Sequence, residues 1–183
     1  MSIAWRDDLL SFWFDELTPQ DWYTGKAETD QAIRERFLQL YRDLFATLPD
    51  EARTDPETAL AAIILFDQFP RNMFRGQTEA FSSDDLAADL ARNALDRSFD
   101  DGLSSDRRQF MYMPLMHSEV LADQERCVSL FKTLGNEEGV KYAVEHRDII
   151  ARFGRFPHRN RVLGRESTGN ERRFLDEHAG YGQ

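Results

Sequence analysis

Polar side chains that can bind ligands or transfer protons interrupt three stretches in which helical periodicity otherwise predicts a buried face. The stretches cover residues 66–76, 117–125 and 146–160, and each contains an acid, an amide or an imidazole at an interior position. A polar group that is buried without a partner costs about 1–3 kcal/mol, so such groups should contact one another or a ligand. The pattern therefore predicts a polar site between helices, but it does not specify a reaction.

The first of these groups lies on a helix that we predict for residues 56–69. Apolar residues surround the axis of this helix, so it should be buried on all sides, and beyond its first turn only Asp67 and Gln68 are polar. Asp67 falls near the C-terminal end, where the helix dipole disfavours an anion. It must therefore contact a cation or have a raised pKa. The candidate cations are Arg71, Arg75, Arg147 and Arg155.

Two further predicted helices also direct polar side chains inward. On the helix over residues 119–134, Gln124 lies in the middle of the apolar sector and Asp123 at its edge. On the helix over residues 140–153, His146 and Arg147 lie inside the apolar sector. Because three helices contribute, we predict one shared cluster. Its members are Asp67, Gln68, Asp123, Gln124, His146 and Arg147, with Arg71, Arg75, Arg155, His158 and Arg159 at its rim.

The first function that fits such a cluster is ligand binding. Proline and glycine end the preceding helices at residues 69–72 and 154–160 and leave arginine side chains at the turns. Arginine at a turn is suited to the recognition of carboxylate or phosphate groups. We therefore expect Arg71, Arg75, Arg155 and Arg159 to hold a small anionic molecule or the end of an acidic peptide.

The second function that fits is a hydrolase-type enzyme for a small molecule. Asp67 or His146 would act as the general base. His117 or His158 would act as the general acid, and the arginines would stabilise negative charge. No nucleophile with a partner base can be identified, and Cys127 lies among apolar positions typical of a core residue. The third reading is a structural or interaction protein whose polar cluster only fixes helix packing.

Recognisable metal and cofactor motifs are missing from the sequence. It contains no HExxH, Glu-x-x-His pair or cysteine cluster, and no GxGxxG, P-loop or GxSxG. We therefore assign no metal and no cofactor. A carboxylate and imidazole metal site stays open as a minor alternative, because His117 lies two residues before Glu119.

The elements that must position these residues are all predicted to be helices. Capping signals mark helix starts at Thr54-Asp55-Pro56, Ser82-Ser83-Asp84, Ser104-Ser105-Asp106, Asn136-Glu137 and Thr168-Gly169-Asn170-Glu171, and a long amphipathic helix precedes them and ends at Pro49. Their spacing is typical of antiparallel helical hairpins, and no strand pattern occurs. We predict one all-α domain over residues 1–183. It includes an N-terminal aromatic helix with an irregular loop (1–28) and an arginine-rich loop (154–167) that folds over a pocket mouth.

The overall charge restricts the possible partners. A net charge of −10 argues against general binding to nucleic acid or to an anionic membrane. The segment from Lys141 to Arg173 is nevertheless basic, with nine Lys and Arg against four acids. This segment either binds a small anion or neutralises the acidic side chains in the rest of the chain. Because a signal peptide, a long apolar run and a disulfide framework are all missing, we expect a cytoplasmic protein; its oligomeric state is not predicted.

The three polar stretches also resemble the bacterial domain-of-unknown-function family 924. The resemblance is carried by residues 64–76, by residues 112–125, and by residues 146–148 together with 156–165, and it extends from about Trp5 to Leu175. It implies an all-helical fold similar to the tetratricopeptide superfamily. It implies no particular activity and no catalytic residues. The tetratricopeptide repeat consensus itself is not present in the chain.

Overall fold

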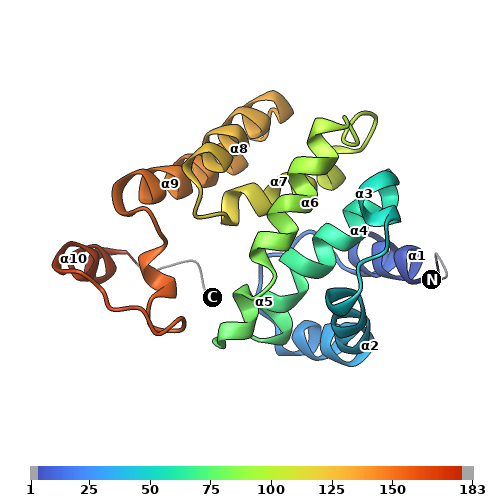
Figure 1. Cartoon of the computed structure of the whole chain (residues 1–183), viewed down its shortest axis with the longest axis horizontal. Helices are drawn as coiled ribbons and strands as arrows, with labels where there is room; N and C mark the ends of the chain where they lie inside the picture. Colours follow the sequence, from blue (N-terminus) through green and yellow to red (C-terminus); the bar gives the residue numbers. More distant parts are fainter. Residues whose placement is uncertain (1–3, 179–183) are drawn as a thin grey trace.

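Every regular element that the computed structural model has within residues 4–178 is a helix (Figure 1). The structure describes residues 4–178. In chain order its elements are α1 (Ala4–Ser11), a π-helical turn η1 (Phe12–Glu16), α2 (Ala27–Ala46), α3 (Glu51–Thr54), α4 (Pro56–Asp67), α5 (Phe69–Met73), a 3-10 turn η2 (Thr78–Phe81), α6 (Asp84–Asp96), α7 (Ser105–His117), α8 (Leu121–Leu134), α9 (Glu137–Phe153), a 3-10 turn η3 (Pro157–Arg159) and α10 (Gly169–Glu177). The predicted all-α, single-domain fold class is confirmed. The predicted domain limits at residues 1 and 183 lie outside the described residues.

The central helix is α4. Its residues from Thr58 to Asp67 are all buried, as the predicted all-round apolar surface requires. The helix starts where its cap was predicted, because the Asp55 side chain accepts a hydrogen bond from the Thr58 amide at 2.9 Å and Pro56 occupies the first turn. Helices α1, α3, α5, α6 and α7 pack against it. The C-terminal end of α4, which carries Asp67, is therefore enclosed by protein.

A proline ends α4 and places the next helix beside it. The helix predicted to continue to residue 69 stops at Asp67, because Pro70 has no amide hydrogen to donate to the Phe66 carbonyl. That carbonyl accepts a hydrogen bond from the Ser83 hydroxyl at 2.7 Å instead. Since Ser83 directly precedes α6, this bond brings the first turn of α6 against the end of α4.

Helices α6 to α9 follow one another as packed neighbours. In Figure 1, α6 lies across α4, α7 contacts α6 and α8, and α8 pairs with α9. The side chains of Ser104 and Asn136 cap α7 and α9, at the predicted positions. Gly135 and Gly154, with φ values of 74° and 70°, end α8 and α9 in the left-handed conformation that glycine adopts easily.

Two further helix limits differ from the prediction. The helix predicted over residues 119–134 starts at Leu121, so Glu119 lies in the connection before it. The long helix predicted to end at Pro49 ends at Ala46. None of the helices within residues 4–178 is long and apolar enough to cross a membrane. The similarity to the tetratricopeptide superfamily stays a prediction.

The C-terminal segment, residues 154–177, has a small apolar cluster beside it that is separate from the main core. This cluster consists of Ile149, Ile150 and Phe156, with Phe153 and Phe174 packed against it. The segment extends from the end of α9 at one side of the molecule (Figure 1). Polar contacts join it to the helical body, and one of them runs from the Thr78 hydroxyl to the Val162 carbonyl at 3.0 Å.

Candidate functional site

The interior site is built around a carboxylate and an imidazole at the ends of two packed helices. Asp67 is the last residue of α4, and His117 is the last residue of α7. Because α4 and α7 pack together, Asp67 Oδ1 lies 2.7 Å from His117 Nδ1. The Asp67 side chain is 1% exposed and the His117 side chain 10% exposed. The second carboxylate oxygen accepts a hydrogen bond from the side-chain amide of Gln68.

The surroundings of this pair determine where its proton resides. Burial would raise the pKa of Asp67, but His117 and Arg71 outweigh burial and hold that pKa below its ordinary value. Burial lowers the pKa of His117, against the pull of the Asp67 carboxylate. At neutral pH the pair is therefore an ionised Asp67 that accepts the Nδ1 hydrogen of a neutral His117. The other ring nitrogen, Nε2, is left as a proton acceptor.

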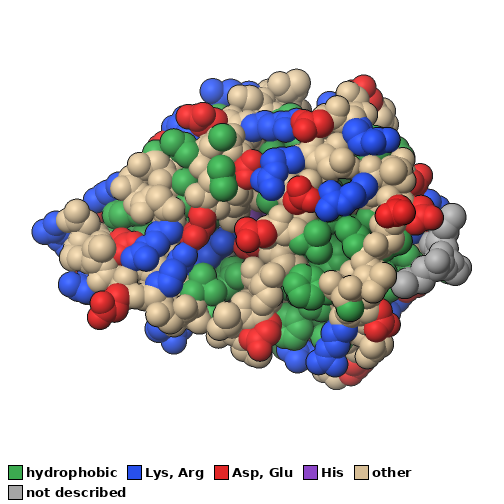
Figure 2. All heavy atoms as spheres, in the orientation of Figure 1, with side chains coloured by type: hydrophobic (Ala, Val, Ile, Leu, Met, Phe, Trp, Pro, Cys, Tyr) green, Lys and Arg blue, Asp and Glu red, His purple; other side chains and the backbone are tan. Residues whose placement is uncertain are grey.

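The acceptor nitrogen of His117 can be reached from outside. Within residues 4–178, His117 Nε2 has no hydrogen-bond partner, and this atom is not fully buried. Figure 2 shows a few imidazole atoms at the surface, with acidic and basic side chains around them. A small molecule that reached Nε2 of His117 would meet the basic nitrogen of the ring.

A second neutral imidazole lies beside the first. The ring centroids of His146 and His117 are 6.5 Å apart, and His146 Nδ1 donates to the Tyr142 carbonyl at 2.8 Å. Burial, with a smaller contribution from His117, lowers the pKa of His146 to about 3. The edge of His146 contacts Phe156, whose ring centroid is 5.4 Å away. His146 is therefore next to the Asp67–His117 pair, as a neighbour of His117.

Two arginines share one carboxylate next to the pair. Arg71 donates to both oxygens of Asp84 at 3.0 Å, and its Nη1 lies 3.7 Å from Asp67 Oδ1. Arg159, from η3, donates to Asp84 Oδ2 at 3.0 Å. We call this set the Arg71–Asp84–Arg159 bridge. It joins α5, α6 and η3 and thereby holds the C-terminal segment against the helical body.

Of the four candidate cations for Asp67, three have other carboxylate partners. The three pairs are Arg75 with Asp30 at 2.9 Å, Arg155 with Glu171 at 2.6 Å, and Arg147 with Asp148. Arg71 is the predicted cation that contacts Asp67. Arg147 also fails the prediction of an interior position, because its side chain is 34% exposed and bonds to its sequence neighbour. A helical wheel compares residues of one helix only, so it cannot show that a carboxylate from another element lies next to an arginine.

Asp123 and Gln124 are buried as predicted, but their partners are structural. Asp123 accepts hydrogen bonds from Arg92 and from the Ser118 hydroxyl, both at 2.7 Å. Gln124 donates from Nε2 to the backbone carbonyls on either side of His117, at 2.6 and 2.7 Å. These carbonyls lie at the end of α7, where the helix provides no partner. Gln124 therefore fixes the backbone that carries His117 and does not join the cluster itself.

His158 belongs to an aromatic stack on the C-terminal segment. Its ring lies 6.1 Å from that of Phe156, 6.3 Å from that of Phe174 and 5.8 Å from that of His178. Burial lowers the pKa of His158 to about 4. His158 thus contacts Phe156, and Phe156 also contacts His146. His158 therefore lies at the edge of the cluster and not at the Asp67–His117 pair.

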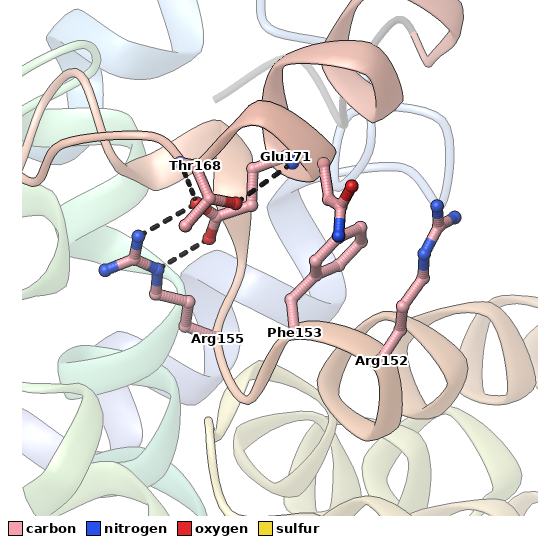
Figure 3. Close-up of a pocket in the computed structure, with 6 residues that line it drawn as sticks. Arg152, Phe153, Arg155, Thr168 and Glu171 are labelled. Atoms are coloured by element: carbon pink, nitrogen blue, oxygen red, sulfur yellow. Dashed lines mark hydrogen bonds and ion pairs between the residues drawn. The ribbon is translucent and has the colours of Figure 1, made fainter.

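Arg155 lies in a surface hollow of the C-terminal segment (Figure 3). The hollow is lined by Arg152, Phe153, Arg155, Thr168, Asn170 and Glu171. Figure 3 shows Arg155 directed at Glu171, whereas Arg152 points away from both. Glu171 and Thr168 also form the predicted capping box of α10. Arg155 therefore stabilises the start of α10, in a hollow that contains neither Asp67 nor His117.

Sequence reasoning missed the connecting residues of the site. Asp84 was interpreted only as a helix-capping residue, since an acid in a first turn is common. Glu119 accepts hydrogen bonds from the Phe156 amide at 2.8 Å and from Arg165 at 2.8 and 3.0 Å. Within residues 4–178 no group of three or more His, Cys, Asp and Glu side chains is arranged to hold a metal ion. Only the spatial contacts identify Asp84 and Glu119.

Comparisons with known proteins agree on the fold and the family. A family model described as "Bacterial protein of unknown function (DUF924)" matches residues 9–179. Among solved structures, the chain is similar to the protein of unknown function ATU0120 from Agrobacterium tumefaciens, with 38% sequence identity and a TM-score of 0.91. That similarity covers 97% of this chain and 100% of the other. No curated protein matches the chain.

Proposed function

The chain belongs to the DUF924 family of bacterial proteins of unknown function, and we propose that its interior cluster is an acid–base site acting on a small molecule. One observation carries the proposal. A fully buried carboxylate, Asp67, bonds to Nδ1 of His117 at 2.7 Å, while Nε2 of the same ring has no partner within residues 4–178. An imidazole that a carboxylate orients in this way is suited to act as a general base.

Two roles differ from the sequence-based assignment. His117, expected as the acid, is the general base, because its Nε2 is the available acceptor. Asp67, expected as the base, is a positioning residue: it keeps the hydrogen on Nδ1 and stabilises the imidazolium that forms when Nε2 takes a proton. His146 adds a second neutral ring beside His117. Arg71 favours the ionised state of Asp67.

Hydrolysis is the reaction class that these residues support best. Within the described residues, the hydrogen bond of the His117 ring is to Asp67, and no serine, threonine or cysteine is bonded to it. Cys127 is buried, and burial raises the pKa of its thiol, so a thiolate is not readily formed there. The group from which Nε2 takes a proton is then water. The water oxygen would attack the substrate as the bond to the leaving group breaks, and the protonated ring would return the proton to that leaving group.

Binding of a small anion or an acidic peptide end, without chemistry, is the second candidate. The observation that favours it is Arg159, a guanidinium with a 7% exposed side chain that makes one hydrogen bond, to Asp84, within residues 4–178. Of the four arginines predicted to hold an anion, Arg71 and Arg159 lie at the cluster, whereas Arg75 and Arg155 are bonded to their own carboxylates. A binding protein and an enzyme would use the same two arginines.

The proposal is tested by screening the purified protein against small carboxylic esters, amides and phosphate esters. We expect turnover by the wild-type protein and a loss of about 10²–10⁴-fold in His117→Gln, since general-base catalysis contributes that much. His178→Gln is the matched control, because His178 bonds to Glu145 away from the pair. Both variants are compared by circular dichroism, so that a folding defect is recognised.

Two results would contradict the acid–base proposal. One is turnover that survives in His117→Gln at the wild-type rate. The other is the absence of turnover above the uncatalysed rate in all three substrate classes. If no anion bound either, the purely structural reading of the cluster would be the better one.

A further inference from the structure

The Arg71–Asp84–Arg159 bridge holds more positive than negative charge. It contains two guanidiniums and one carboxylate, and the three side chains are 11%, 13% and 7% exposed. Asp67 supplies a second negative charge 3.7 Å from Arg71, but Asp67 also bonds to His117. Within the bridge, Arg71 takes both oxygens of Asp84, and Arg159 shares one of them. Arg159 is therefore the less well neutralised cation.

The guanidinium of Arg159 is held rigidly, with donors to spare. Phe156 and Phe81 lie 4.5 and 4.8 Å from it, measured to the ring centroids. These contacts fix the orientation of the guanidinium. One of its five N–H groups donates to Asp84. The other nitrogens have no hydrogen-bond partner within residues 4–178, but they are not fully buried, so a ligand can reach them. Burial lowers the pKa of Arg159 to about 10, and Arg71 adds to this effect.

We propose that Arg159, together with Arg71, binds the carboxylate or phosphate group of the substrate, and that Asp84 occupies this anion site in the present structure. The proposal rests on the proposed function. A carboxylate side chain offers guanidinium the same pair of oxygens as a ligand carboxylate or two oxygens of a phosphate. The substrate class is then a small oxyanion.

The anion site and the general base belong to one cluster. Phe156, which contacts Arg159, is also the ring against which His146 packs at 5.4 Å. The His146 ring in turn lies 6.5 Å from the His117 ring. Arg71, which shares Asp84 with Arg159, lies 3.7 Å from Asp67, and Asp67 bonds to His117. A substrate whose anionic group bonds to both arginines therefore lies beside the Asp67–His117 pair. Arg159 fixes the position of the substrate, and His117 receives the proton.

Asp84 must compete with such a ligand. If Asp84→Asn removes this charge, both arginines lose a counter-ion, and an external anion should replace it. Hydrogen bonds to charged groups contribute enough to change affinity by about tenfold or more. We therefore expect Asp84→Asn to bind an oxyanion about tenfold more tightly than the wild-type protein. Asp85→Asn is the matched control, because Asp85 is the next residue, carries the same charge and is exposed.

The experiment measures binding of inorganic phosphate and of acetate by isothermal titration calorimetry and by the shift in melting temperature. Wild type, Asp84→Asn, Asp85→Asn and Arg159→Lys are compared. We expect tighter binding in Asp84→Asn than in Asp85→Asn or the wild type, and loss of binding in Arg159→Lys. Preference for phosphate or for acetate assigns the anionic group of the substrate. Arg161→Lys controls for the arginine change, since Arg161 is exposed.

The inference is overturned if Asp84→Asn binds both anions no more tightly than Asp85→Asn, or if Arg159→Lys binds them as the wild type does. Should Arg159→Lys fail to fold, the comparison of Asp84→Asn with Asp85→Asn decides alone. The outcome is separable from that of the proposed function. Loss of turnover in His117→Gln tests the base, whereas phosphate and acetate binding tests the anion site.

Discussion

At the scale of single residues, the Asp67 and His117 side chains are both buried, and each is the hydrogen-bond partner of the other. The carboxylate is fully buried and stays ionised because His117, Arg71 and Gln68 surround it. Removal of one partner from a buried ion pair leaves the other charge without a counter-ion. The resulting loss of stability is larger than the net stability that the intact pair contributes. The same surroundings that keep Asp67 charged therefore make the site sensitive to substitution.

Asp67→Asn should lower the free energy of unfolding by about 3–5 kcal/mol, since the His117 N–H loses its charged acceptor and the buried Arg71 keeps Asp84 as its remaining carboxylate. Urea denaturation monitored by circular dichroism measures the change. Asp85→Asn, at an exposed position, is the control and should stay within about 0.5 kcal/mol of wild type. An equal loss in both variants would show that the buried charge has no special role.

His146 should make the protein sensitive to acid. Its pKa is lowered to about 3 in the folded state, against a reference near 6.5, so the unfolded chain binds more protons below that reference. Stability is therefore fully present above about pH 6.5 and decreases as the pH falls toward 3, by a few kcal/mol. His146→Gln should flatten this dependence in urea denaturation curves between pH 6.5 and 4. An identical slope in the variant would refute the assignment.

The sequence correctly placed several single residues, but it did not identify their partners. Asp67, Gln68 and His146 were predicted to face inward because their neighbours on the wheel are apolar, and all are buried. The hydrogen bond from His117 to Asp67 spans 50 residues, and that from Arg159 to Asp84 spans 75. Helical periodicity contains no information about contacts between helices that are so far apart in sequence.

At the scale of elements, the connection between α7 and α8 organises the C-terminal segment. Glu119 lies in this connection and bonds to the Phe156 amide and to Arg165, which bracket Arg159 in sequence. These three bonds hold both ends of the stretch that carries Arg159. The position of the proposed anion site therefore depends on Glu119.

Glu119→Gln should loosen residues 156–165, because the bidentate bond to Arg165 is replaced by weaker neutral contacts. Hydrogen exchange read by mass spectrometry is expected to become faster in peptides from this stretch, with α4 and α6 unaffected. Glu125→Gln provides a control at an exposed position of α8. Unchanged exchange in residues 156–165 would mean that other contacts hold the segment.

The central helix α4 should be the least tolerant element. Ile63 is 0% exposed at its middle, and Ile63→Ala should lower the free energy of unfolding by about 2–5 kcal/mol through the cavity it leaves. Leu121, which is 40% exposed, is the control, and Leu121→Ala should have a much smaller effect. Thermal and urea unfolding measure both. Comparable losses in the two variants would contradict the assignment of α4 as the core.

Helix starts were predictable because capping is local. Asp55, Ser104, Asn136 and Thr168 each accept a hydrogen bond from an amide three residues later, so the signal and its partner lie within one turn. The break between α4 and α5 was misplaced because Pro70 affects the chain before it. How the arginine-rich loop folds depends on Glu119 and Asp84, which belong to other elements.

At the scale of the whole molecule, the basic C-terminal region is neutralised by the acidic body and by its own acids. Arg159 bonds to Asp84 and Arg165 bonds to Glu119, while Arg155 is paired with Glu171 inside the segment. Figure 2 shows acidic and basic side chains interspersed over the visible face. Of the two sequence-based readings of this region, these pairs favour internal neutralisation, with Arg159 as the residue that retains donors for a ligand.

The protonation state of His117 is the property on which the proposed function depends most directly. Two-bond ¹H–¹⁵N correlation spectra of the imidazole rings, recorded from pH 4 to 8 for the wild type and for Asp67→Asn, report the tautomer and the pKa. We expect a neutral His117 with its hydrogen on Nδ1, a pKa below the reference of about 6.5, and loss of the Nδ1 preference in Asp67→Asn. A hydrogen on Nε2, or a pKa near 6.5 in both proteins, would contradict the account.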